Sequence, residues 1–263
     1  MGTPVLGDVV TTTEGAGGIR LRNAAFGYRD RVVLRNIDLT LPQGSLVAIV
    51  GANGAGKSTL LKGLTGEIPV IAGELDFGGL DRAAIAYLPQ TAEIDRSFPI
   101  SVRDFAAMGL WSRIGALRPV GRRGAAAIAA ALATVGLDDT ARAPIGRLSG
   151  GQFQRLLFAR LMLRDAPVIL LDEPFASIDR ETTEDLSAVM AQWHADGRTV
   201  IAALHDLDIV RRVFPQTLRL ADGGARFGST PEMLSVVAET PSRDSVGIHV
   251  RTGRSLSFAG AVA

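Results

Sequence analysis

Four short apolar runs constrain the fold of this chain more than any other feature. They cover residues 46–50, 85–88, 168–171 and 200–204. Runs of this kind are typical of strands that are buried on both faces of a parallel sheet. Helical stretches are expected between them, at residues 58–65, 103–110, 124–135, 151–164 and 181–195. Alternating strands and helices predict an α/β layered fold with a parallel sheet.

The two ends of the chain differ from this alternating middle. Ile19–Tyr28 and Val32–Leu41 alternate between apolar and polar residues around Arg29–Asp30, which predicts an antiparallel hairpin. Residues 1–18 are rich in Thr and Gly and contain no Lys or Arg, so we expect a disordered tail rather than a signal peptide. Residues 227–263 form a short C-terminal extension to which the sequence assigns no role.

Composition narrows the function classes. The 263 residues include no cysteine, which excludes a disulfide scaffold, a thiol catalyst and a metal site with cysteine ligands. Lys and Arg number 28 and Asp and Glu 27, so the net charge is +1 and we expect no nucleic-acid partner. The longest weakly polar stretch, residues 125–137, is shorter than the ~20 residues of a membrane-spanning helix. We therefore expect a soluble intracellular protein, with any membrane role supplied by a partner.

A glycine follows the first of the four apolar runs, and polar residues follow the other three. Gly51 follows the first, Gln90 the second, Asp172 and Glu173 the third, and His205 the fourth. Open α/β sheets bind ligands at the carboxyl ends of their strands, so these residues are expected at one edge of the sheet. Any one of them alone could be an ordinary polar loop residue. Four groups of them at one edge indicate a binding site.

Residues 51–58, with the sequence GANGAGKS, fit the pattern G-x-x-x-x-G-K-S/T between a buried strand and a helix. Glycines let the backbone wrap closely around phosphate oxygens, and the helix N-terminus attracts their charge. Lys57 is placed to reach β- and γ-phosphates, and the Ser58 hydroxyl to hold Mg²⁺. The alternative is a glycine-rich turn that only begins a helix. The nucleotide contacts expected in this loop are those of Gly51, Asn53, Gly54, Ala55, Gly56, Lys57, Ser58 and Thr59.

Lysine is rare in this chain. Lys57 and Lys62 are the only two, and arginine supplies the other 26 cations. A compact ammonium fits between phosphates better than a forked guanidinium does, which explains a lysine at position 57. Lys62 has no partner that the sequence indicates, and we expect it on a solvated helix face.

Two adjacent acids end the third apolar run. Asp172 is placed to support Mg²⁺, and Glu173 to polarise an attacking water. Two acids after a strand could also cap a helix. The phosphate loop on the neighbouring run favours the catalytic interpretation.

Residues 148–152, with the sequence LSGGQ, precede a predicted helix shortly before the acidic pair. This segment resembles the signature motif of ATP-binding cassette (ABC) ATPases, and the order and spacing of the other motifs agree over residues 19–226. The resemblance implies one P-loop NTPase domain over 19–226, with a RecA-like parallel-sheet core. It also implies an N-terminal antiparallel β subdomain and an inserted α-helical subdomain at about residues 91–160.

The resemblance also implies roles for individual residues. Tyr28 matches the aromatic residue that stacks on adenine. Gln90 matches the loop glutamine that touches Mg²⁺ and senses the membrane partner. His205 matches the histidine that contacts the γ-phosphate, and Asp179, in the segment 177–179, matches a loop that crosses to the second subunit.

The signature offers a second anion site in the same chain. Ser149, Gly150 and Gly151, followed by Gln152, supply a hydroxyl and amides at a helix N-terminus. The alternative is an ordinary helix cap followed by flexible glycines. In the family, two cassettes pack head to tail, and each signature closes over the ATP of the other. The expected reaction is attack of water, activated by Glu173, on the γ-phosphate of ATP, with Lys57, Mg²⁺ and His205 offsetting the developing charge.

The type of cassette follows from what the chain lacks. It has no spanning segments of its own, a single phosphate loop, and too short a gap between loop and signature for a long coiled coil. It therefore resembles the ATPase subunit of a multi-subunit importer. The implied partners are a polytopic membrane permease, a second copy of the chain, and a periplasmic or lipid-anchored solute-binding protein reached through the complex. The implied location is the cytoplasmic face of the plasma membrane.

The segment after Gln90 bears on the substrate. Residues 98–102, with the sequence FPISV, are similar to an element of zinc and manganese importer ATPases. This similarity favours a divalent metal ion, zinc before manganese. The alternatives are an iron–siderophore, haem or cobalamin importer and, from another class, a non-transport ABC ATPase. His194, His205 and His249 show no metal-ligand spacing, so we do not expect this chain to bind the transported ion.

Overall fold

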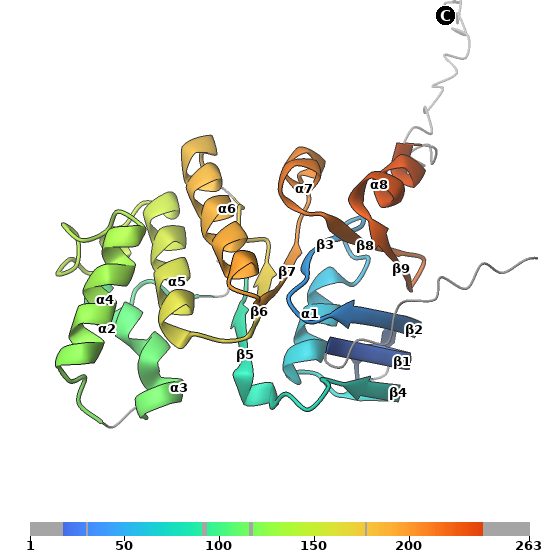
Figure 1. Cartoon of the computed structure of the whole chain (residues 1–263), viewed down its shortest axis with the longest axis horizontal. Coiled ribbons are helices and arrows are strands. Elements are labelled where there is room, and N and C mark those ends of the chain that lie inside the picture. The colour runs from blue at the N-terminus through green and yellow to red at the C-terminus, as the bar shows by residue number, and fades with distance from the viewer. Residues whose placement is uncertain (1–17, 30, 91–93, 116–117, 177, 239–263) are drawn as a thin grey trace, which may run out of the picture.

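A computed structural model describes residues 18–29, 31–90, 94–115, 118–176 and 178–238 (Figure 1). The strands are β1 (Gly18–Tyr28), β2 (Arg31–Pro42), β3 (Leu46–Val50), β4 (Val70–Asp76), β5 (Ile85–Leu88), β6 (Val168–Asp172), β7 (Thr199–Ala203), β8 (Gln216–Ala221) and β9 (Gly224–Ser229). The helices are α1 (Lys57–Thr65), α2 (Val102–Ala107), α3 (Trp111–Ile114), α4 (Arg122–Thr134), α5 (Gly150–Arg164), α6 (Arg180–Ala195), α7 (Leu207–Val213) and α8 (Thr230–Ala238). The predicted tail, residues 1–18, lies outside the described residues except for Gly18.

The larger sheet has the strand order β5-β6-β7-β3-β8-β9. All its pairs are parallel except β8–β9, which is an antiparallel hairpin. The four predicted buried strands are confirmed as β3, β5, β6 and β7. Every residue of β3, β6 and β7 is buried, as expected of strands covered on both faces. The fold is therefore the predicted α/β fold with a parallel sheet.

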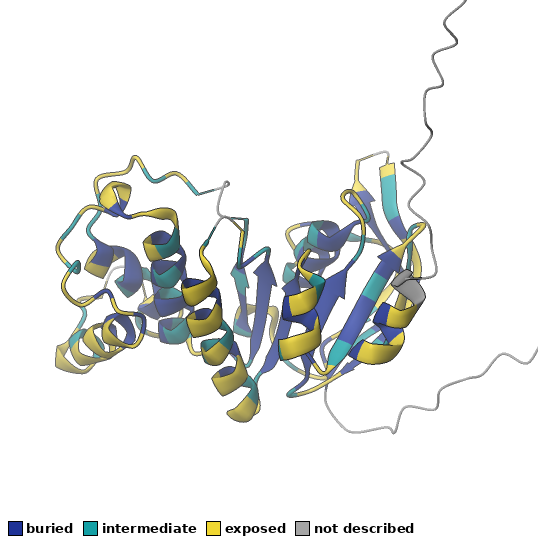
Figure 2. Ribbon diagram, turned by 90° about the horizontal axis from the view of Figure 1, so that it is seen from above, coloured by how far each residue is buried: buried dark blue, intermediate teal, exposed yellow. Residues whose placement is uncertain are grey.

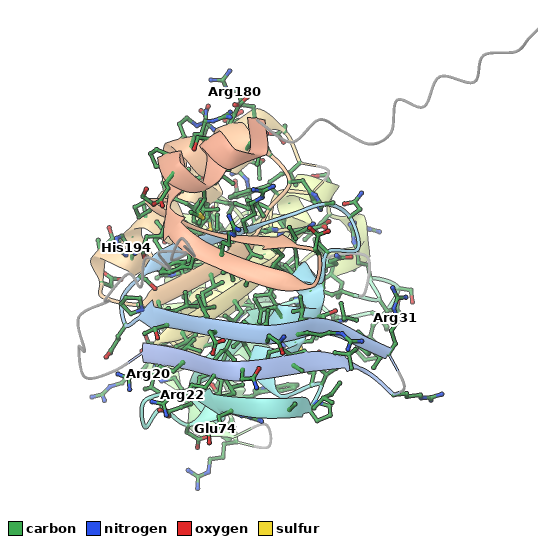
Figure 3. The ribbon with its side chains drawn as sticks, turned by 90° about the vertical axis from the view of Figure 1, so that its right-hand side faces the viewer. Arg20, Arg22, Arg31, Glu74, Arg180 and His194 are labelled. Carbon is green, nitrogen blue, oxygen red and sulfur yellow. The ribbon has the colours of Figure 1, made fainter. Side chains whose placement is uncertain are left out.

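The smaller sheet is antiparallel, with the order β2-β1-β4. The predicted N-terminal hairpin is confirmed, and β4, which the sequence analysis did not predict, adds a third strand. An ion pair of 4.0 Å joins Arg22 of β1 to Glu74 of β4 (Figure 3). Both side chains are largely exposed, so this pair contributes little to stability. The sheet is held instead by its buried face, which packs on α1 through Phe26.

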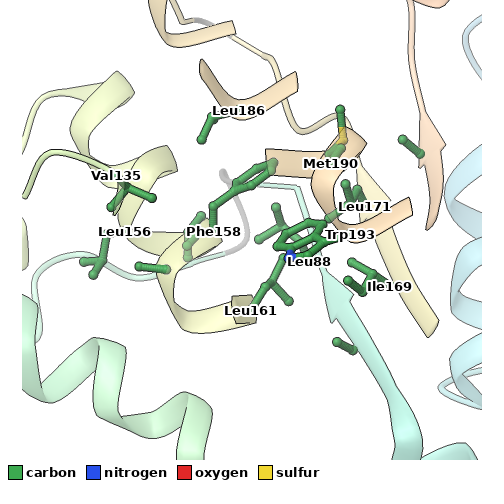
Figure 4. Close-up of a cluster of buried hydrophobic side chains, with 14 of the residues drawn as sticks. Leu88, Val135, Leu156, Phe158, Leu161, Ile169, Leu171, Leu186, Met190 and Trp193 are labelled. Atoms are coloured by element: carbon green, nitrogen blue, oxygen red, sulfur yellow. The ribbon is translucent and has the colours of Figure 1, made fainter. Parts of the chain in front are cut away.

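The hydrophobic core lies on both faces of the larger sheet, which forms the buried centre of the molecule in Figure 2. One face packs against α1 and the antiparallel sheet. The other packs against α5 and α6, where the rings of Phe158 and Trp193 stack with centroids 5.5 Å apart (Figure 4). Stacked aromatic rings of this kind stabilise a core beyond the burial of their area. The contact joins α5, the helix that begins within the signature segment, to α6.

Helices α2 to α5 gather at one end of the molecule, away from the antiparallel sheet (Figure 1). They span residues 102–164, whereas the helical subdomain that the resemblance implies, at about residues 91–160, stays a prediction. The domain limit placed at residue 226 falls inside β9, and α8 then packs on β8 and β9. The folded unit thus extends further than predicted, because residues 224–229 pair with β8 across a turn at Asp222–Gly223. Residues 239–263 lie outside the described residues.

Among the helices of the described residues, none is both long and apolar enough to cross a bilayer.

Gly63 provides a test of the packing between α1 and β1. A Cβ atom at this position would lie 2.4 Å from Cδ1 of the fully buried Phe26. We expect Gly63→Ala to lower the free energy of unfolding by about 1–3 kcal/mol, measured by urea denaturation. Gly224→Ala is the control, because Gly224 does not have a left-handed backbone conformation and an added Cβ would meet only the Ala221 carbonyl oxygen, at an ordinary 3.7 Å. Equal unfolding midpoints for the two variants would contradict this packing.

Candidate functional site

The loop between β3 and α1 is shaped by glycines in left-handed conformations. Gly54 has φ 80° and Gly56 has φ 101°, values that favour glycine. A Cβ on Gly56 would also lie 2.8 Å from Cδ2 of Leu34. Gly56 precedes the first residue of α1 without a side-chain cap, so the first amides of this helix remain available to an anion.

Lys57 is buried in this loop, with 6% of the residue exposed. Its Nζ donates to the carbonyl oxygens of Gly51, at 2.9 Å, and Ala52, at 3.2 Å. Burial lowers the pKa of Lys57, while the nearby carboxylates of Glu173 and Asp172 raise it. The ammonium is thus held inside the loop by carbonyl oxygens, which a phosphate group can replace as acceptors.

Asp172 ends β6 beside this loop and is 2% exposed. The Tyr87 hydroxyl lies 3.4 Å from its Oδ2, and its buried Oδ1 has no hydrogen-bond partner among the described residues. Burial raises the pKa of Asp172, against the effects of the Ser58 hydroxyl, Tyr87 and Lys62, which lower it. Lys62 is therefore not the solvated residue that we expected. It is half-buried on α1, where its charge acts on Asp172.

The three predicted metal ligands lie together. The Gln90 amide lies 3.4 Å from the Ser58 hydroxyl, and Ser58 in turn acts on the Asp172 carboxyl. Hydroxyl, amide and carboxylate oxygens are ligands suited to Mg²⁺. The unpartnered, buried Oδ1 of Asp172 supplies the negative charge that such an ion needs. These residues fit Mg²⁺ held next to a bound phosphate chain.

Glu173 and His205 contact each other at the ends of β6 and β7. His205 Nε2 lies 2.5 Å from Glu173 Oε1. Glu173 has φ 51°, a left-handed conformation that is uncommon for a residue with a side chain. Its backbone N–H donates to the Ala203 carbonyl oxygen at 3.1 Å. Strained conformations of this kind cluster at functional sites. The sequence placed both residues at this edge but did not predict their direct contact.

A hollow of about 440 Å³ lies over the loop. This volume is in the range of small-molecule sites. It is lined by Tyr28, Arg31, Val33, Asn53, Gly54, Gly56, Lys57, Ser58, Thr59, Gln90 and Glu173. Tyr28, which is 47% exposed, thus stands at the same hollow as the phosphate loop, where the sequence analysis expected adenine. The sequence analysis did not predict Arg31 and Val33 at this hollow. They could have been inferred from the predicted hairpin, because its second strand begins opposite Tyr28.

The signature segment lies elsewhere. Ser149 caps α5 by accepting from Gln152 N at 3.2 Å, and Gln152 Oε1 accepts from Ser149 N at 3.0 Å, a reciprocal capping box. No residue of 149–152 lines the hollow over the loop. Asp179 caps α6 through Thr182, and these hydrogen bonds lower the pKa of Asp179. Within one chain, therefore, residues 149–152 and Asp179 are not brought to the phosphate loop; Ser177 lies outside the described residues.

His194 is remote from this edge, on α6 (Figure 3). Its Nδ1 lies 2.8 Å from the Gly44 carbonyl oxygen, which joins α6 to the turn before β3. This contact indicates that His194 has a structural role, which is to hold α6 against the turn before β3. In the described residues, His, Asp and Glu side chains form no group of three that could hold a metal ion.

Comparison with known proteins decides the family. Residues 34–176 match the protein family described as ABC transporter. This chain belongs to the ABC transporter ATPases. It is 36% identical to the manganese transport system ATP-binding protein MntB of Bacillus subtilis, over 83% of this chain and 89% of that protein. It is 34% identical to the zinc transport system ATP-binding protein TroB of Treponema pallidum, over 78% of this chain and 79% of that protein.

A solved structure agrees with the fold of this ABC transporter ATPase. A chain from an ABC transporter assigned to the metal-chelate type, in an inward-facing conformation, superposes with a TM-score of 0.74. The two chains are 27% identical, and the match covers 83% of this chain and 85% of the other. The predicted P-loop NTPase fold is confirmed, and the activity of the family is ATP hydrolysis coupled to transport.

Substitution of Asp172 tests the cost of its buried charge. Because burial raises the pKa of Asp172, ionisation at neutral pH opposes folding, and Asp172→Asn removes that cost. We expect the melting temperature of the nucleotide-free variant at pH 7 to rise by about 2–4 °C, or roughly 1 kcal/mol. The difference should shrink as the pH falls from the raised pKa of the folded chain toward about 4, and it should vanish below that, where the carboxyl is protonated in both the folded and the unfolded chain. A variant that is less stable than wild type at pH 7 would contradict this account.

The two lysines provide a matched pair of substitutions. Lys57→Arg should weaken ATP binding roughly 10–100-fold in calorimetric titration, because the buried loop leaves little room for a guanidinium. Lys62→Arg keeps the charge near Asp172 and should change the affinity by less than about threefold. Equal effects of the two substitutions would show that Lys57 does not bind the phosphates.

Proposed function

We propose that this chain is the ATP-hydrolysing subunit of an importer of a divalent metal ion. One observation carries the proposal: the phosphate loop, the acidic pair, Gln90 and His205 meet at one edge of the sheet in a chain of this family. The relatives named for manganese and for zinc transport support the metal class. Residues 98–102 are similar to an element of the same importers.

The proposed reaction uses the side chains at the loop. The amides at the start of α1 and the Lys57 ammonium bind the β- and γ-phosphates of ATP. Glu173 orients the attacking water and accepts its proton, and His205, which contacts Glu173, would bind the γ-phosphate. Bound Mg²⁺, held by Ser58, Gln90 and Asp172, would neutralise charge on the phosphates. Tyr28 stacks on the adenine at the open side of the hollow.

The separation of the two anion sites supports a head-to-tail dimer. Ser149 and the Gly150 and Gly151 amides stand at a helix N-terminus outside the chain's own hollow. In the proposed dimer they complete the site of the second copy, and Asp179 lies in the crossing segment. Closure around two ATP molecules then changes the shape presented to a polytopic permease. The complex would hold this chain at the cytoplasmic face of the membrane and would include a solute-binding protein.

The second candidate is a metal-chelate importer. It is favoured by the solved transporter of that type, which shares 27% identity with this chain. An iron–siderophore, haem or cobalamin complex would then replace the free ion as the transported substrate. The ATPase site is the same in both candidates, so they differ only in the permease and in the solute-binding protein.

Glu173→Gln tests the catalytic assignment. The amide cannot take a proton, so we expect ATP turnover to fall by about 10²–10⁴-fold while ATP binding is retained. The variant should accumulate as an ATP-dependent dimer in size-exclusion chromatography. Glu181→Gln, an exposed acid on α6, is the control and should turn over ATP normally. Normal turnover by Glu173→Gln would overturn the assignment.

Growth under chelation tests the substrate. A strain that lacks this chain should grow poorly with a divalent-metal chelator, and a supplement of the transported ion should restore growth. Rescue by zinc alone or by manganese alone identifies the ion. Rescue by neither, together with rescue by an iron chelate, would replace the first candidate with the second.

A further inference from the structure

Backbone hydrogen bonds join residues 100–102, which lead into α2, to residues 143–145, which lead to the signature segment. Val102 N donates to Ala143 O at 2.9 Å, and Ile145 N donates to Ile100 O at 3.0 Å. Ser101 and Pro144 form an isolated β-bridge between these two bonds. Two segments about 40 residues apart in sequence therefore run side by side as far as Ile145, three residues before Leu148.

Arg96 extends this attachment to the signature itself. Its Nη2 donates to the carbonyl oxygen of Leu148, and its guanidinium lies over the ring of Phe153, 4.7 Å from the centroid. Leu148 directly precedes Ser149, and Phe153 lies in the first turns of α5 and is fully buried. In the described part of the chain, Arg96 forms no ion pair, so these two contacts account for its position.

The contact with Leu148 fixes a peptide plane. The Leu148 carbonyl and the Ser149 N–H belong to one rigid peptide unit. Arg96 binds the carbonyl end of this unit, and Gln152 Oε1 binds its N–H end at 3.0 Å. With both ends held, the direction of the Ser149 side chain and of the following Gly150 and Gly151 amides is set.

We propose that Arg96 is a positioning residue that holds the signature segment in the orientation needed to bind nucleotide on a second copy of the chain. Arg96 does not touch the chain's own hollow, so it acts only through residues 148–151. This inference rests on the proposed function, because it requires that the signature complete the site of another chain. It predicts that binding of ATP to one chain and closure of two chains respond differently to loss of Arg96.

The test uses the full chain with Glu173→Gln, which is expected to form a stable ATP-bound dimer. Arg96→Ala, Arg96→Lys and the control Arg142→Ala are added to it; Arg142 is an exposed arginine close to the attached segment. Calorimetry with ATP at low protein concentration gives the affinity of the single chain. Analytical ultracentrifugation with ATP gives the dimer dissociation constant.

We expect Arg96→Ala to weaken dimerisation by about tenfold or more, since each dimer loses two charged hydrogen bonds that orient its binding groups. ATP affinity of the single chain should stay within about twofold, because the hollow is untouched. Arg96→Lys keeps a cation and one donor but not the planar fork, so it should fall between Arg96→Ala and wild type. The Arg142→Ala control should dimerise normally.

Each outcome decides the inference. If all Arg96 variants dimerise as the control does, Arg96 does not position the signature. If ATP affinity and dimerisation fall together, Arg96 stabilises the fold as a whole rather than the signature segment, and the inference is also wrong. If Arg96→Ala does not fold, Arg96→Lys decides in the same way. If Glu173→Gln with Arg96 intact binds ATP but never dimerises, the proposed function itself fails, and that result is visible before any Arg96 variant is compared.

Discussion

Parallel pairing of three buried strands is the constraint on which the site depends. Ala203 of β7 is in register with Ile49 of β3 on one side and with Asp172 of β6 on the other. The three strands therefore end level, and backbone hydrogen bonds continue one residue further, from Leu204 to Ile49 and from Glu173 to Ala203. Because these strands are wholly buried, a slip in register would expose the core or bury polar groups. The positions of the proposed catalytic groups are thus set by packing that takes no part in the proposed reaction.

Several features at this edge of the sheet lower the stability of the folded, nucleotide-free chain. Lys57 and Asp172 are charged groups with little access to water, and Glu173 occupies an uncommon backbone conformation. The carboxylates of Glu173 and Asp172 offset part of the cost at Lys57, because they raise its pKa, and Lys62 offsets part of the cost at Asp172, because it lowers the pKa of that carboxyl. A bound nucleotide with its metal ion would supply the missing partners: phosphate for the lysine, and a cation for the unpaired oxygen of Asp172. The site is therefore arranged for its ligand rather than for the stability of the free chain.

Much of this edge could be predicted from sequence because each motif follows directly from an apolar run. The loop, Gln90, the acidic pair and His205 lie next to strands that a simple pattern identifies, and parallel topology then brings them together. β4 and β8 could not be found in this way, since β4 is largely exposed and β8 alternates apolar residues with Gln216 and Arg219. The environment of Lys62 was also beyond the sequence, because it depends on how α1 lies against β6. The contact of Arg96 with Leu148 joins segments whose pairing no local pattern indicates.

The separation of Ser149 from the chain's own hollow has a consequence for measurements in solution. An enzyme whose complete site needs two chains follows the concentration of pairs, not of chains. The proposed ATPase, studied without its membrane partner, would thus lose specific activity on dilution even though each chain still binds ATP. In a transporter, two copies held by one permease are kept at a fixed high local concentration. Assembly with the membrane partner would then convert a reaction that is second order in the free chain into one that is first order in the complex, so that the specific activity no longer falls on dilution.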